Sequence, residues 1–361
     1  MSDTPSPTPN YGSPPPPPQV ILQQQPPSAF GRYGKFLIVL LVLAVMSLIG
    51  MSASYQSYFS EPGAPQEKYH SLSKTADKKI AIIDISDTIL DTDGFVKQQL
   101  DRVRKDDDVV ALVLRIDSPG GTVTASDFLY HHVVELAKDR KLPVVVSMGG
   151  ICASGGYYIA MAVGEVEDTL FAEPTTWTGS IGVVIPHYDL SGMLASFHVK
   201  DDSIASDKFK LMGSPTRELS PAERAEERKL FQELVDNSFD RFKEIVLRGR
   251  PKYREDEDAF KKVTNGQIFT ASQALELGLV DQIGFVEAAI ERAAKLAKRD
   301  PDDLRCIKYQ EPVTPLDALM SVKASEPPSV LSNLQALLDL SAPRAYYLCT
   351  WLPGWLEGAA R

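Results

Sequence analysis

The hydrophobic pattern predicts strands that alternate with helices from about residue 78 onward. Short apolar runs typical of buried strands occupy residues 79–85 (KIAIIDI), 109–116 (VVALVLRI) and 143–147 (PVVVS). The two segments between them, 93–105 and 125–138, carry apolar residues at helical spacing. This alternation favours an α/β domain with parallel strand pairing and right-handed crossovers.

The pattern continues beyond this first unit and weakens toward the C-terminus. Ser220-Pro221-Ala222-Glu223 has the form of a capping box with proline at the first helical position, so a long amphipathic helix should begin there. Another strand, turn and helix follow from residue 266 to about 297. We therefore predict one folded domain at residues 78–298 and treat 299–361 as a C-terminal extension of unknown role. Its final aromatic cluster, YYLCTWLPGWLEG, could contact the membrane surface or a neighbouring subunit, but a packing role is favoured.

Residues 36–53 form an apolar stretch of eighteen residues without a charge. That length is sufficient for a helix to cross the hydrocarbon core of a membrane. Arg32 and Lys35 precede it, and the positive-inside tendency then places the N-terminus in the cytoplasm and the rest of the chain outside. A cleaved signal peptide is the alternative, but the proline-rich segment ahead of the stretch favours a transmembrane anchor at residues 31–54.

The segments on either side of the apolar stretch are polar. Residues 1–30 are rich in proline, serine and glutamine, so they bury too little apolar surface to offset the entropy of ordering. We expect a disordered, proline-rich cytoplasmic tail there and a polar linker at residues 55–77.

The composition narrows the classes of partner. The net charge of the 361-residue chain is -10, which argues against a nucleic-acid partner because phosphate binding needs clustered positive charge. The three cysteines lack C-x-x-C spacing and neighbouring histidines, so we expect no metal site and no cofactor. A disulfide between Cys306 and Cys349 stays open, because it would need an oxidising compartment.

Two glycine-rich turns, 117–122 and 149–158, directly follow predicted strands. Ligands of open α/β sheets bind beyond the carboxyl ends of the strands, where both turns should lie. Ser154 would stand near the N-terminus of a helix, whose free N–H groups and dipole favour a developing negative charge. With the amides of Gly120 and Gly121 beside it, this arrangement is typical of a nucleophile next to an oxyanion hole.

The same residues permit other interpretations. Ser154 could simply cap the helix while the glycines make tight turns, or the two turns could hold a phosphate or an acyl-CoA thioester. No G-x-S-x-G elbow is present, so an α/β-hydrolase fold is not supported.

A catalytic serine needs a base. Among the five histidines only His187, which follows the strand predicted at 181–185, is a candidate for a triad. A lysine held neutral by burial is the other option. Lys208 and Lys210 flank Phe209, and in an extended segment both would face the same side, so spacing does not choose between them.

Five motifs in order resemble the signatures of the signal peptide peptidase A family. They are SPGG (118–121), ASGGYY (153–158), TGSIGV (178–183), KLM (210–212) and ALELGLVD (274–281). The resemblance covers roughly residues 78–298. It implies a Clp-protease/crotonase-like α/β fold and a serine endopeptidase with a Ser–Lys dyad.

Position by position, the resemblance implies a role for each motif residue. Ser154 corresponds to the nucleophile, Lys210 to the general base, and Ser180 to the hydroxyl that orients the lysine amine. Gly120, with its neighbour Gly121, and the amide of Gly155 correspond to the oxyanion hole.

The resemblance also implies partners and a location. Short-form members of the family form ring-shaped homo-oligomers in which adjacent subunits supply the serine and the lysine. Their substrates are peptides, the hydrophobic remnants of cleaved signal peptides. The implied location is the bacterial inner membrane, crossed once, with a cytoplasmic N-terminus and an extracytoplasmic catalytic domain.

Two other functions are compatible with part of this pattern. A crotonase-like enzyme acting on acyl-CoA shares the paired amides, but an extracytoplasmic location disfavours it because CoA is cytosolic. A catalytically silent ring scaffold is the other rival, and the presence of Ser154, Lys210 and Ser180 together argues against it.

Overall fold

The computed structural model describes residues 29–59, 65–311 and 346–348. The chain divides into two compact units, Met1–Pro62 and Gly63–Arg361. In the first unit, helix α1 (Ala29–Phe59) contains one segment, Tyr33–Ser52, that is long and apolar enough to cross a membrane, with a mean hydropathy of 2.4. Residues 1–28 of the predicted tail and 60–64 of the predicted linker lie outside the described residues.

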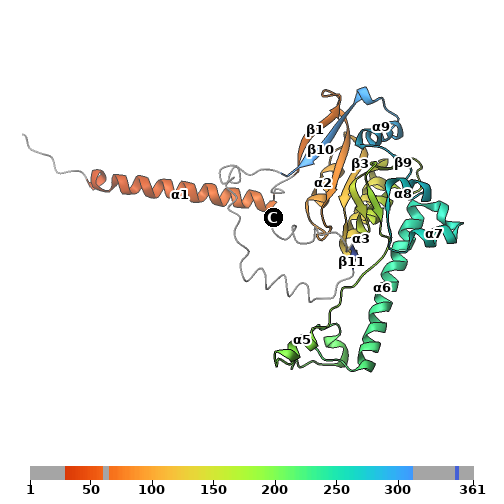
Figure 1. Ribbon diagram of the computed structural model, residues 1–361. Coiled ribbons are helices and arrows are strands. Elements are labelled where there is room, and N and C mark those ends of the chain that lie inside the picture. Colours follow the sequence, from red (N-terminus) through yellow and green to blue (C-terminus); the bar gives the residue numbers. More distant parts are fainter. Residues whose placement is uncertain (1–28, 60–64, 312–345, 349–361) are drawn as a thin grey trace, which may run out of the picture. The chain divides into compact units, whose positions relative to one another are not determined.

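A mostly parallel sheet forms the centre of the second unit (Figure 1). Its main path is β1-β10-β2-β3-β5-β6-β9, with β7 paired to the end of β5 and β8 paired to β7. Only the β1–β10 and β7–β8 pairs are antiparallel among these strands. The bounds are β1 (Gln66–Leu72), β2 (Lys78–Ser86), β3 (Val109–Ser118), β5 (Val144–Ala153), β6 (Leu170–Ala172), β7 (Trp177–Gly179), β8 (Ile268–Thr270), β9 (Gln282–Ile283) and β10 (Leu304–Gln310). The predicted α/β class with parallel pairing is confirmed.

Helices cover both faces of the sheet, which explains why its central strands are apolar runs. Alternate side chains of β2 and β3 enter two separate cores because successive residues of a strand point to opposite faces. One core contains residues of α2 (Phe95–Arg104), α3 (Val123–Arg140) and α4 (Gly155–Ala160), and the other contains residues of α9 (Val286–Leu296).

Two strands of the sheet lie outside the predicted domain of residues 78–298. Strand β1 falls in the segment predicted as a linker, and β10 falls in the segment predicted as a C-terminal extension. Strand β1 is the edge of the sheet, and all of its residues are exposed or half-buried, so its sequence lacks an apolar signal. The placement of β10 between β1 and β2 depends on pairing with strands distant in sequence, which local patterns do not encode.

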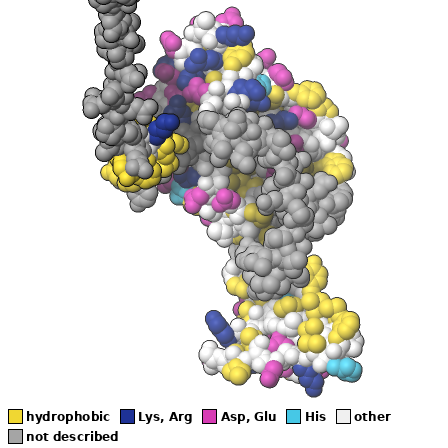
Figure 2. Space-filling model, turned by 90° about the vertical axis from the view of Figure 1, so that its left-hand side faces the viewer, with side chains coloured by type: hydrophobic (Ala, Val, Ile, Leu, Met, Phe, Trp, Pro, Cys, Tyr) yellow, Lys and Arg dark blue, Asp and Glu magenta, His cyan; other side chains and the backbone are white. Residues whose placement is uncertain are grey.

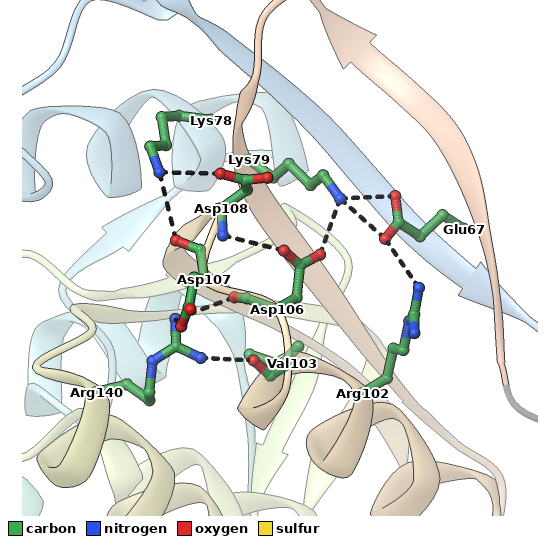
Figure 3. Close-up of polar contacts among 9 residues, drawn as sticks. All are labelled: Glu67, Lys78, Lys79, Arg102, Val103, Asp106, Asp107, Asp108 and Arg140. Carbon is green, nitrogen blue, oxygen red and sulfur yellow. Dashed lines mark hydrogen bonds and ion pairs between the residues drawn. The ribbon is translucent and has the colours of Figure 1, made fainter. Parts of the chain in front are cut away.

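A charged cluster holds β1 against the sheet (Figure 3). The ammonium of Lys79 lies 3.0 Å from a carboxylate oxygen of Glu67 on β1 and 2.8 Å from one of Asp106, in the turn after α2. Burial opposes the charge on Asp106, but its hydrogen bonds with Lys79 and the backbone of Asp108 outweigh burial and lower its pKa. Burial likewise opposes the charge on Lys79, and its bonds to both carboxylates raise its pKa.

Helix α6 (Pro221–Gly249) begins at the predicted capping box. Ser220 Oγ accepts the N–H of Glu223, whose carboxylate accepts the N–H of Ser220. Only its C-terminal half packs on the core, through Phe242, Ile245 and Val246. The shorter helices are η1 (Met161–Val163), α5 (Ser191–Ser196), η2 (Lys208–Leu211), η3 (Pro251–Arg254), α7 (Glu257–Val263), α8 (Ala271–Leu277) and η4 (Pro301–Asp303).

Residues 186–235, which we call the arm, extend from the sheet as α5, η2 and the N-terminal half of α6 (Figure 1). Acidic side chains organise the arm internally. Glu227 forms an ion pair with Arg217 at 2.7 Å and accepts the N–H of Gly213. Large apolar side chains are exposed on the arm (Figure 2), among them Tyr188, Met193, Phe197 and Ile204.

Candidate active site

Ser154 lies between the end of β5 and the start of α4 in a backbone conformation that residues other than glycine rarely adopt. Its φ is 52° and its ψ is -114°. Hydrogen bonds hold this conformation on both sides: its N–H donates to the carbonyl of Gly179 and its carbonyl accepts the N–H of Tyr158, each at 2.8 Å. Such strain costs about 1–3 kcal/mol and is concentrated at functional sites.

The Ser154 hydroxyl is buried, with 1% of the residue exposed, and it has no hydrogen-bond partner among the described residues. Ser154 is the N-cap residue of α4, but its hydroxyl makes no capping hydrogen bond to the first turn of the helix. A buried hydroxyl without a partner is costly in a native structure, so it calls for a functional explanation.

The glycines of the first turn contact Ser154 directly. Strand β4 (Gly120–Thr122) begins at Gly120, whose φ is +102°. A Cβ added there would lie 2.7 Å from the amide nitrogen of Gly155 and 3.1 Å from Ser154 Cβ. A Cβ on Gly155 would lie 3.2 Å from the Cα of Gly120. The absence of side chains at both positions therefore permits the contact between the two turns.

The amide groups at this contact are not equivalent. The N–H of Gly120 donates to Ser118 Oγ at 3.1 Å. Gly155 is the first residue of α4, and the first amides of a helix have no intrahelical acceptor. A Cβ on Gly121 would lie 1.8 Å from the carbonyl oxygen of Ile89, so the lack of a side chain at Gly121 allows the backbone at Ile89 to approach closely. The amide of Gly155 therefore has no intrahelical acceptor, whereas that of Gly120 is bonded to Ser118.

Ser180 lies beside Ser154 because β5 and β7 pair in register. Ala153 is opposite Gly179, and the two serines directly follow this pair. Ser180 is buried and also has a positive φ, of 51°, fixed by donation of its N–H to the carbonyl of Gln267 at 2.7 Å. The structure thus brings together five predicted site residues: Ser154, Ser180, Gly120, Gly121 and Gly155.

Lys210 is not among them. It lies in η2 on the arm, where it is exposed, and the isolated chain does not bring it to the Ser154 hydroxyl. The expectation of an extended segment is wrong here, because residues 208–211 form a 3-10 helix and side chains two apart point in different directions. The ammonium of Lys208 is paired with Glu226 at 2.5 Å, whereas that of Lys210 has no ion pair with any described residue.

His187 is also separated from Ser154. Its ring lies 5.8 Å from that of Phe231 on α6, measured between centroids, and lines a groove of about 670 Å³ on the arm. No hydrogen bond connects it with the serine within the parts of the chain that the structure describes.

Cys152, two residues before Ser154, is not suited to act as a nucleophile. Cys152 is fully buried, and burial, with the charge of Asp117, raises the pKa of its thiol well above the usual value. A thiol that resists ionisation is a poor nucleophile. Within residues 29–59, 65–311 and 346–348, no group of three His, Cys, Asp or Glu side chains is placed to hold a metal ion. Cys306 is buried in β10, and Cys349 lies outside the described residues.

A C-terminal strand at this site was missed by the sequence reasoning. Strand β11 (Tyr346–Leu348) pairs antiparallel with β4, and the side chain of Tyr347 is fully buried. The available signal was the start of the aromatic cluster near the C-terminus: Tyr347 packs in the core, whereas residues 349–361 lie outside the described residues.

Comparison with known proteins connects this geometry with a protease family. Residues 136–300 match the model of peptidase family S49. A Synechocystis sp. protein named as a protease is 39% identical over 237 residues, which are 65% of this chain and 80% of the relative. An Enterococcus faecium protein named as signal peptide peptidase SppA is 35% identical over 253 residues, 66% of this chain and 69% of the relative.

A longer relative extends the match. Protease 4 of Salmonella typhi is 35% identical over 290 residues, which are 76% of this chain and 44% of that protein. The match to the family model includes Ser154, Gly155, Ser180 and Lys210, and the glycine turn at 120–121 precedes it. The chain belongs to peptidase family S49, the family of these SppA and protease 4 relatives, and is a serine-type peptidase.

Proposed function

We propose that this chain is a membrane-anchored serine endopeptidase that hydrolyses remnant signal peptides, with Ser154 as nucleophile and Lys210 as general base. The observation that carries the proposal is the buried, strained Ser154, which lies beside the Gly120 turn and whose hydroxyl has no partner among the described residues. The substrate class follows the name of the Enterococcus relative and the apolar helix at the N-terminus.

In the proposed reaction, Ser154 Oγ attacks the carbonyl carbon of the scissile peptide bond. A neutral Lys210 takes the hydroxyl proton and later donates it to the leaving amine, and Ser180 orients the lysine. The amide of Gly155, beside the Gly120–Gly121 turn, stabilises the oxyanion of the tetrahedral intermediate. Water then hydrolyses the acyl-enzyme, with the lysine again acting as base.

The lysine would have to come from an adjacent subunit. Lys210 is exposed and lacks an ion-pair partner in the described part of the chain, and it sits on an arm that extends from the domain containing Ser154. Burial against a neighbouring subunit would desolvate its ammonium and lower its pKa, as a general base requires. A ring-shaped homo-oligomer would repeat this contact around the assembly.

The N-terminal helix supports the proposed location. Residues 31–54 would anchor the chain in the bacterial inner membrane, with the proline-rich tail in the cytoplasm and the catalytic domain outside. The length and hydropathy of Tyr33–Ser52 suit a membrane span, and the SppA and protease 4 relatives are consistent with membrane association. We further propose that the mostly parallel α/β fold is of the Clp-protease/crotonase type.

Matched variants test the dyad. A fluorophosphonate probe should label Ser154, and Ser154→Ala should abolish both labelling and cleavage of a synthetic signal peptide. Lys210→Ala should lower kcat by about 10²–10⁴, the usual contribution of general acid–base catalysis, while Lys208→Ala and His187→Ala retain activity. Lys208 is the control for charge, because its loss removes an exposed ion pair with Glu226 and a contact with the ring of Phe209.

Opposite results would overturn the assignment. If His187→Ala abolished cleavage and Lys210→Ala did not, the base would be the histidine. If the probe failed to label Ser154 in an assembled, folded sample, the acyl-CoA rival would gain support.

A further inference from the structure

The ALELGLVD motif (274–281) has no role in the proposed reaction, but its last residue, Asp281, forms a buried ion pair with Arg250. Arg250 directly follows α6, and its Nη1 lies 2.6 Å from one carboxylate oxygen of Asp281. The other oxygen accepts the N–H groups of Thr169 and Leu170, at 2.8 and 2.9 Å. Leu170 begins β6 and Arg250 is only 7% exposed, so the pair fastens the end of α6 to the sheet.

Arg250 also connects α6 with the helix that follows the nucleophile. Its Nε and the hydroxyl of Tyr157 in α4 donate to the same carbonyl, that of Leu279, at 3.3 and 2.8 Å. A Cβ on Gly249, the last residue of α6, would lie 3.0 Å from the Cα of Met161 in η1, which directly continues α4. The end of α6 therefore lies so close to α4 and η1 that no side chain fits at Gly249.

Helix α6 packs on the core at one end only, so a small tilt is amplified at the other end (Figure 1). Phe242 is the first fully buried residue of the packed half. At 1.5 Å per residue, Arg250 lies about 12 Å from Phe242 in one direction and Pro221 about 32 Å in the other. A tilt about Phe242 that displaces the Arg250 end by about 1 Å would move the far end by roughly 2.5 Å.

The far half of α6 holds the segment that contains Lys210. Glu227 of α6 is buried, accepts the N–H of Gly213 at 3.2 Å and pairs with Arg217 at 2.7 Å. Gly213 follows shortly after Lys210 in the chain. The direction of α6 therefore determines where Lys210 lies with respect to its own domain.

We propose that Arg250 is a positioning residue for the lysine: by fixing the direction of α6, its pair with Asp281 determines where Lys210 meets the serine of the adjacent subunit. The inference rests on the proposed function for the role of Lys210 as base. Well-packed apolar residues often stabilise a fold as well as a buried ion pair does, whereas the planar fork of a guanidinium also imposes a direction. A misplacement of about 1 Å can slow a reaction about 10²-fold.

Substitutions in the full-length chain test the kinetic consequence. Arg250→Met leaves Asp281 with its two backbone donors and should lower kcat for a synthetic signal peptide on the order of 10²-fold, with KM unchanged. Arg250→Lys keeps a charge opposite Asp281 but loses the fork that also reaches the Leu279 carbonyl, so kcat should fall less, on the order of tenfold. Arg250→Lys is also the variant to measure if Arg250→Met does not fold, and a wild-type kcat for a folded variant would overturn the inference.

The matched control is Arg254→Met, the same substitution in the turn after α6. It removes an exposed ion pair with Glu165 and should leave kcat and KM unchanged. A loss of kcat equal to that of Arg250→Met would overturn the inference, because the effect would then follow the charge and not the buried pair.

A second background separates positioning from a general effect on the fold. If Arg250 acts through the lysine, Arg250→Met should change the residual cleavage of the Lys210→Ala chain by less than about twofold. An equal loss in both backgrounds would show that Arg250 acts on the fold around Ser154, and would overturn the inference.

The direction of α6 can also be measured without catalysis, which separates this inference from the proposed function. Lys138 of α3 and Lys229 of α6 are exposed and can be replaced by spin-labelled cysteines, with Cys349 changed to alanine. With labelled subunits diluted among unlabelled ones, Arg250→Met should broaden the distance distribution between the labels. A distribution as narrow as that of wild type would overturn the inference. Normal cleavage by Lys210→Ala together with a broadened distribution would refute the proposed base and keep the role of Arg250 in directing α6.

Discussion

Alanine at position 120 would test whether the backbone next to Ser154 is shaped for a reacting carbonyl. The new Cβ would stand 2.7 Å from the amide nitrogen of Gly155 and 2.1 Å from the carbonyl that β11 places there. Both neighbours are backbone atoms, so neither can move away as a flexible side chain could. In the proposed reaction, the methyl group would block the space shared by the oxyanion and the Gly155 amide.

The substitution should have two effects, one on the free energy of unfolding and one on the rate of cleavage. The φ of +102° at Gly120 is strained for alanine, which should reduce the free energy of unfolding by about 1–3 kcal/mol. Loss of one oxyanion donor typically lowers kcat by about 10²–10³. Gly120→Ala should therefore lower kcat/KM by at least this factor while the chain remains folded.

Gly164→Ala is the matched control. Gly164 has a φ of +67° and a ψ of -147°, but a Cβ there would meet no atom within 4 Å. The Gly164→Ala variant should have the same kind of backbone strain but an unchanged rate of cleavage. Denaturant unfolding and cleavage of a fluorogenic peptide should be measured for both variants. If Gly120→Ala and Gly164→Ala retained the same kcat/KM, the turn at Gly120 would not adjoin the reacting atoms.

Two further predictions concern stability and reactivity. Lys79→Ala should lower the free energy of unfolding at pH 7 by about 2–3 kcal/mol, because Glu67 and Asp106 lose a partly buried partner. The pKa of Asp106 is lowered in the folded chain, so its ion pair with Lys79 stabilises the fold at pH values above the pKa of the unfolded chain, about 3.9, and this stabilisation is lost at lower pH. The difference in unfolding free energy between Lys79→Ala and wild type should therefore shrink at pH 3. The pKa of Lys79 is raised in the folded chain, so the same difference in unfolding free energy should also shrink above about pH 10.5, where the ammonium loses its charge. A difference that did not change with pH would refute an electrostatic origin of this stabilisation. Cys152 should resist iodoacetamide at pH 8 in the folded chain and react after unfolding, and mass spectrometry showing rapid labelling of native protein would contradict the burial that raises its pKa.

The elements predicted best from the sequence are those whose signal is local. Strands β2, β3 and β5 have continuous apolar runs because helices cover both faces of the sheet. Helix α6 begins with a capping box whose two hydrogen bonds form within four residues. Strands β1, β10 and β11 were not predicted, because their positions depend on pairing with strands distant in the sequence.

The candidate site likewise has features that local sequence predicts and features that depend on distant parts of the chain. Glycine-rich turns after strands predicted the position of Ser154 and its contact with the Gly120 turn, since the carboxyl ends of parallel strands meet at one edge. Periodicity and spacing contain no information on the strained φ of Ser154, which depends on pairing with β7. The location of Lys210 depends on the direction of a 29-residue helix, which local sequence does not determine.

The length of helix α6 has a consequence for how a dyad shared between subunits would be controlled. At 1.5 Å per residue its 29 residues span roughly 43 Å, and η2 with Lys210 lies in the segment that leads into its far end. Under the proposed dyad, the length of this helix sets the distance between the Ser154 residues of neighbouring subunits. The packing of the subunits would then also determine whether Lys210 reaches the serine of its neighbour. A dilute single chain would then hold a serine without its base, and newly made enzyme would not cleave membrane proteins before it assembles.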